Sequence, residues 1–125
     1  MSSTETSTES KVEILFKVEL EEEGQTIVHC YNSFEGLQRI WPSTILIDNL
    51  GNEYKLIHAE GISIAPNWCM PKLAGNGLKT FTLIFENLAK AASSFRLEEQ
   101  IPEPGGFYTK DIPVNQTGVY HVQIF

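Results

Sequence analysis

Apolar and polar residues alternate in several short segments of this chain, and this period of two constrains its fold most strongly. In the segment 79–86 (KTFTLIFE), Phe81, Leu83 and Phe85 fall on one face of an extended strand. Such alternation is typical of β-strands with one buried face, whereas an amphipathic helix repeats every ~3.6 residues. No segment of useful length has the helical period. The sequence therefore predicts an all-β protein.

The same alternation recurs between stretches of turn-forming residues. Further strands are expected at 11–20, 26–31, 39–48, 54–58, 61–65, 95–99 and 118–125. DNLGNE at 48–53 and IPEPGGF at 101–107 are rich in Asp, Asn, Gly and Pro, which favour turns and loops. About seven to eight short strands in a domain of roughly 115 residues predict an immunoglobulin-like antiparallel β-sandwich.

Composition bounds the organisation of the chain and excludes several partners. Its 125 residues fit one domain. The Ser/Thr/Glu-rich residues 1–10 are expected to form a disordered tail, which leaves 11–125 as a single β-sandwich domain. A net charge of −7 argues against nucleic acid and against an anionic membrane surface as partners. The first residues have neither the basic nor the apolar part of a secretory signal, so we expect a cytoplasmic protein.

No group of residues in the sequence predicts catalysis, a metal or a cofactor. The chain has no G-x-S-x-G motif, and His29, His58 and His121 are scattered without the spacing of metal ligands. The two cysteines, Cys30 and Cys69, are expected to be free thiols, because disulfide frameworks belong to exported, cysteine-dense chains. We therefore expect a protein that is not an enzyme.

Two loops are the candidates for binding. APNWCMPKLAG at 65–75 carries Trp68, Met70 and Leu73 outside the alternating pattern. This loop either plugs one end of the sandwich, the more frequent outcome for long loops in small domains, or contacts a partner, because tryptophan and methionine are favoured at binding surfaces. Phe107, next to Tyr108, is a possible anchor in the second loop, at 101–107.

A family resemblance supports the same fold. The segments WPSTILIDNLGNEY (41–54), KTFTLIFENL (79–88) and SFRLEEQIPEPGGF (94–107) resemble small uncharacterised bacterial domains with an immunoglobulin-like sandwich. The D-x-x-G-x-x-Y hairpin followed by F-x-L-x-F-E is similar to the telokin-like sandwich modules of bacterial lipoproteins. The resemblance covers about residues 11–125. It implies a fold but no activity, and it assigns no functional residue.

The sequence thus leads to one function hypothesis with an alternative. We expect a non-catalytic module that binds a protein or peptide partner through Trp68, Met70, Leu73 and Phe107. The alternative is a β-sandwich that binds a small ligand or calcium, since Asp48, Asn49, Asn52 and Glu53 cluster in one turn. The EF-hand pattern is missing there, and the residues favour a hairpin turn. The sequence predicts no oligomeric state.

Overall fold

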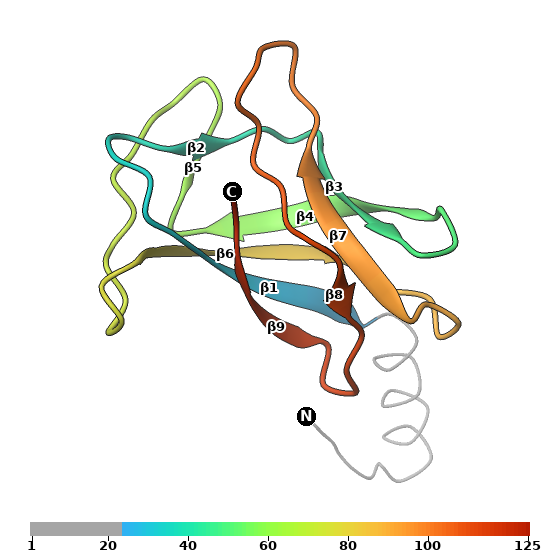
Figure 1. Ribbon diagram of the computed structural model, residues 1–125. Coiled ribbons are helices and arrows are strands. Elements are labelled where there is room, and N and C mark those ends of the chain that lie inside the picture. Colours follow the sequence, from blue (N-terminus) through green and yellow to red (C-terminus); the bar gives the residue numbers. More distant parts are fainter. Residues whose placement is uncertain (1–23) are drawn as a thin grey trace, which may run out of the picture.

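The computed structural model describes residues 24–125, and all regular elements in this range are β-strands (Figure 1). The strands are β1 (Gln25–Asn32), β2 (Arg39–Ile40), β3 (Thr44–Asp48), β4 (Glu53–Glu60), β5 (Ser63–Ile64), β6 (Lys79–Glu86), β7 (Ser94–Glu99), β8 (Ile112–Pro113) and β9 (Val119–Gln123). The all-β prediction is confirmed for these residues. The predicted tail at 1–10 and strand at 11–20 lie outside them. Residues 24–125 include no helix that could span a membrane.

Seven strands form one mixed sheet that is nearly closed into a barrel (Figure 1). Their order is β8-β7-β3-β4-β6-β1-β9, and β2 pairs with β5 in a separate two-stranded sheet. The prediction of an antiparallel sheet is wrong for two pairs, because β1–β9 and β2–β5 are parallel. The two-layer sandwich is not confirmed. Alternation tells which face of a strand is buried, but it leaves open which strand lies beside it and in which direction.

A pair of main-chain hydrogen bonds joins the two ends of the large sheet. The N–H of Tyr108 donates to the carbonyl of Phe125 at 3.2 Å, and the N–H of Phe125 donates back to Tyr108 at 2.9 Å. Tyr108 follows β7 and Phe125 follows β9, so these bonds connect the strands near either edge of the sheet. The curled sheet therefore encloses its inward side chains.

The core consists of the side chains that the alternation placed inward. Phe81, Leu83 and Phe85 of β6 are all buried, which confirms the prediction for that strand. Their partners in the core include Val28, Leu46, Phe95, Leu97, Tyr120 and Val122. Cys30 is buried among these residues, Cys69 is partly buried, and both thiols are free, as predicted. Apolar burial of this kind is the main driving force for folding.

The predicted turn between β3 and β4 is confirmed, and it is organised by one carboxylate. Asp48 accepts hydrogen bonds from the N–H groups of Leu50 (2.8 Å) and Asn52 (2.9 Å), the Asn52 amide (3.0 Å) and the Tyr54 hydroxyl (2.7 Å). Burial raises the pKa of Asp48, but the bonds from Tyr54, Asn52 and Leu50 outweigh burial and lower the pKa to about 2. A calcium ion at this turn would need the Asp48 carboxylate as a ligand, but this carboxylate already accepts four hydrogen bonds within the turn.

Candidate functional site

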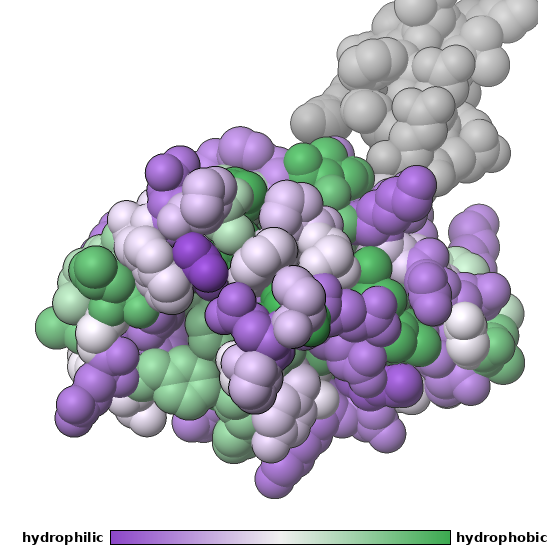
Figure 2. Space-filling view, turned by 90° about the horizontal axis from the view of Figure 1, so that it is seen from above, coloured by the Kyte–Doolittle hydropathy of each residue, from purple (hydrophilic) through white to green (hydrophobic). Residues whose placement is uncertain are grey.

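The two candidate loops meet at one end of the molecule. A cavity of about 150 Å³ lies where the segments 34–41 and 99–107 approach Trp68. Four aromatic side chains line it, those of Phe34, Trp41, Trp68 and Phe107. Figure 2 looks down on the molecule from above the view of Figure 1 and shows apolar patches separated by polar side chains. Segments far apart in the sequence therefore share one potential binding site.

A short main-chain bridge aligns the segment 34–41 with the loop that carries Trp68. The N–H of Gln38 donates to the carbonyl of Cys69 at 2.7 Å, and the N–H of Cys69 donates to the carbonyl of Gln38 at 3.0 Å. In an antiparallel bridge the flanking residues face each other, so Leu37 lies opposite Met70 and Arg39 opposite Trp68. The bridge thus places two apolar side chains and an aromatic–cation pair next to each other.

Leu37, Trp68 and Met70 expose more than half of their surface, at 57%, 53% and 56%. Phe34, which lines the cavity as Leu37 does, is 38% exposed. We call these four residues the loop-end surface. Exposed apolar side chains that gather beside a cavity are candidates for a contact surface.

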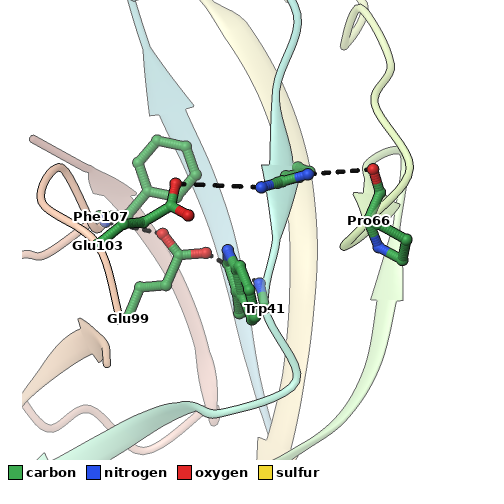
Figure 3. Close-up of polar contacts among 6 residues, drawn as sticks. Trp41, Pro66, Glu99, Glu103 and Phe107 are labelled. Carbon is green, nitrogen blue, oxygen red and sulfur yellow. Dashed lines mark hydrogen bonds and ion pairs between the residues drawn. The ribbon is translucent and has the colours of Figure 1, made fainter. Parts of the chain in front are cut away.

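Arg39 holds the Trp68 indole in place. The guanidinium carbon lies 3.9 Å from the centroid of the Trp68 ring and 5.4 Å from that of Trp41. One guanidinium nitrogen donates to the Pro66 carbonyl at 3.0 Å, and the other lies 4.0 Å from the Glu103 carboxylate (Figure 3). Cation–π stacking of this kind contributes about 0.5–2 kcal/mol. The exposed indole is therefore fixed on one side by Arg39.

Glu99, at the end of β7, joins the second loop to the site. One carboxylate oxygen accepts the N–H of Trp41 at 2.9 Å, and the other accepts the N–H of Phe107 at 3.0 Å (Figure 3). Burial raises the pKa of Glu99, and these two hydrogen bonds offset only part of that rise. The carboxylate satisfies two loop N–H groups at once, so it fixes how the loops approach each other.

The structure separates the four predicted contact residues. Trp68 and Met70 belong to the loop-end surface, so the interpretation of Trp68 as a core plug is wrong. Leu73 is 65% exposed farther along the same loop, where it bridges to Lys79. Phe107 is only 8% exposed and stacks on Phe34 with a centroid distance of 5.5 Å. Its assignment as a surface anchor is corrected: the alternation at this position turns Phe107 inward and Tyr108 outward.

Four residues of the site were not predicted from the sequence: Phe34, Leu37, Arg39 and Glu99. Phe34 and Leu37 carried one usable signal, since they are bulky apolar residues in an irregular segment, as Trp68 and Met70 are. Arg39 and Glu99 carried none, because their roles depend on contacts between segments that are distant in the sequence. Their side chains contact Trp68 and the loop amides only after β2 and β7 are placed.

Residues 24–125 contain no group of three or more His, Cys, Asp or Glu residues placed to hold a metal ion. The loop-end surface presents apolar side chains beside a small aromatic cavity. No protein-family model matches the chain, and comparisons with curated proteins and with solved structures find no match either.

Proposed function

We propose that this protein is a non-catalytic interaction module that binds a segment of a partner protein or peptide at its loop-end surface. This proposal rests on the exposure of three apolar side chains on two bridged segments. Each of them, Leu37, Trp68 and Met70, is more than half exposed. Tryptophan is enriched at binding hot spots, and methionine adapts to varied partners. Binding a partner here buries apolar surface, and each Å² removed from water contributes about 25 cal/mol of favourable free energy.

The side chains of the site are already held in place, and this supports binding in addition to their apolar character. Association costs free energy when flexible side chains become immobilised, about 0.5–1.5 kcal/mol for each rotamer-rich side chain. Trp68 is already stacked on Arg39, which is itself bonded to Pro66. A partner therefore meets a preorganised indole, and less of the interaction energy is lost on binding.

Charges around the cavity favour a basic partner. Glu35 and Glu103 line it and are exposed, whereas Arg39, the one cation that lines it among residues 24–125, is stacked on Trp68. Lys or Arg residues beside the apolar anchor of the partner would meet these two carboxylates. We accordingly propose a partner segment with an apolar side chain flanked by basic residues.

A small ligand is the second candidate, and the cavity is the observation that favours it. Its volume of about 150 Å³ equals that of engineered cavities that bind benzene. Two indoles and two phenyl rings line the cavity, so its ligand would be a small aromatic or aliphatic group. The peptide is preferred because the exposed apolar side chains extend outside the cavity.

We also propose kinship with the immunoglobulin-like, telokin-like sandwich domains of bacteria. Four neighbouring pairs of the large sheet are not consecutive in the sequence, namely β3–β7, β4–β6, β1–β6 and β1–β9. Such crossovers are typical of Greek-key β-proteins. An experimental structure that resolves two face-to-face sheets would support this kinship, and a closed barrel would oppose it.

Partner capture with matched variants tests the proposed function. The immobilised full chain is incubated with host lysate, and bound proteins are compared among the wild type, Trp68→Ala, Met70→Ala and Leu50→Ala. Leu50 is the control, because it is 59% exposed in the β3–β4 turn. We expect Trp68→Ala to reduce capture at least tenfold, since truncation of a hot-spot residue costs about 2 kcal/mol or more. Leu50→Ala should capture as the wild type does.

The same variants show whether the loss comes from unfolding. Trp68 and Met70 are exposed, so either truncation should lower the free energy of unfolding by about 1 kcal/mol or less. Equal capture by the wild type and both loop-end variants contradicts the proposal. Loss of capture by Leu50→Ala alone would move the binding site to the β3–β4 turn.

A further inference from the structure

Two histidines that are distant in the sequence are neighbours on the outer face of the sheet. His29 in β1 and His121 in β9 are register partners in the parallel β1–β9 pair. Their imidazole rings are stacked, with centroids 4.8 Å apart and an interplanar angle of 28°. Sequence spacing could not show this pair, because it arises only when the last strand joins β1.

Each ring is oriented by a hydroxyl group. The Nδ1 atom of His29 lies 2.7 Å from the Thr82 hydroxyl oxygen, and the Nδ1 atom of His121 lies 3.0 Å from the Tyr31 hydroxyl oxygen. In the tautomer with the proton on Nδ1, each hydroxyl oxygen accepts a hydrogen bond from Nδ1–H, and Nε2 keeps its lone pair. Within residues 24–125, neither Nε2 atom has a hydrogen-bond partner.

We propose that His29 and His121 form a binding site for a divalent transition-metal ion, with both Nε2 atoms as ligands. Metal-ligating histidines almost always hydrogen-bond through their other ring nitrogen, as both rings do here. Imidazole suits Ni²⁺, Cu²⁺ and Zn²⁺, and waters complete the coordination of a site with two protein ligands. This site revises the expectation of no metal site drawn from the sequence, and it is independent of the loop-end surface.

The spacing of the two strands is compatible with chelation. Nitrogen ligands lie about 2.0–2.1 Å from such an ion, so the two Nε2 atoms must come within about 4 Å of each other. The ring centroids are 4.8 Å apart, so chelation requires the two rings to turn about their side-chain bonds until the Nε2 atoms face one ion. The β1–β9 ladder fixes the two backbones, so no strand has to move.

Titration of the full chain with Ni²⁺ tests this site, because the paramagnetic ion broadens the NMR signals of the groups that bind it. We expect saturable broadening of the His29 and His121 ring signals at neutral pH. His29→Gln and His121→Gln should each weaken binding at least tenfold. Tyr31→Phe, which removes only the hydroxyl beside His121, should weaken it about 10–100-fold.

His58 supplies the internal control. It lies in β4, is exposed, and has its Nε2 atom 2.6 Å from Glu60. His58→Gln should leave Ni²⁺ affinity unchanged. The proposal is overturned if His58 broadens first, if His121→Gln binds as the wild type does, or if broadening does not saturate by millimolar Ni²⁺. The wild-type spectrum alone decides which rings bind, whatever the stability of the variants.

Discussion

Replacing Phe107 with alanine is expected to lower the free energy of unfolding by about 3–5 kcal/mol, the usual cost of truncating a core phenylalanine. Phe107 is 8% exposed and belongs to the hydrophobic core. Its ring stacks on Phe34 at 5.5 Å and contacts Phe81 at 6.0 Å between centroids. Removing it would enlarge the cavity beside the loop-end surface. Urea denaturation of both proteins measures the difference.

Tyr108 is the matched control for this substitution. It is the next residue in the chain and is 52% exposed, with its ring against Phe125. Tyr108→Ala should cost much less than Phe107→Ala, about 1 kcal/mol. If Phe107→Ala keeps wild-type stability and loses partner capture, Phe107 is a surface contact after all, and its placement in the core is wrong.

Glu99→Gln should destabilise the protein by about 1–3 kcal/mol at pH 7, the cost of leaving one buried polar group unsatisfied. The carboxylate accepts one N–H with each oxygen, from Trp41 and from Phe107. Glutamine has only one oxygen, so its NH₂ group would face one of the two donors. Glu98→Gln is the control, because Glu98 pairs with Arg96 at a partly exposed site, where such pairs contribute about 0–1 kcal/mol.

The difference in unfolding free energy between the wild type and Glu99→Gln should also depend on pH in a defined direction. Burial raises the pKa of folded Glu99 above its value in the unfolded chain, about 4.3. As pH falls, the folded wild type binds this proton first and gains stability, and the gain is complete below the unfolded pKa. Glu99→Gln has no such group. The difference in unfolding free energy should therefore widen from pH 7 toward pH 4, and narrowing would show that the pKa is lowered instead.

Local patterns in the sequence predicted most strands of residues 24–125, because burial of one strand face is a local property, but they joined β2 and β3 into one strand and missed β8. The alternation at 79–86 placed Phe81, Leu83 and Phe85 in the core, and the Asp, Asn and Gly residues at 48–53 marked the β3–β4 turn. The parallel β1–β9 pair was not predictable in this way. Strand direction depends on contacts between the two ends of the chain, which no local pattern encodes.

The candidate site was predicted in part for the same reason. Trp68 and Met70 could be predicted as candidates because they interrupt the alternation, and both are exposed in the structure. Phe107 was wrongly predicted as an exposed contact residue, because a Pro/Gly-rich loop has no regular period from which the direction of its side chains could be inferred. The stack of Arg39 on Trp68 depends on the Gln38–Cys69 bridge, which joins segments with no sequence relation.

The central claim is that partners bind at the loop-end surface, and mapping a bound partner by NMR tests it most directly. Amide and side-chain signals of the labelled full chain are compared with and without the captured partner. We expect the largest shifts at Leu37, Met70 and the indole N–H of Trp68, with little change at Leu50 or His58. Shifts confined to the β3–β4 turn or to the outer face of β1 and β9, with Trp68 unchanged, would contradict it.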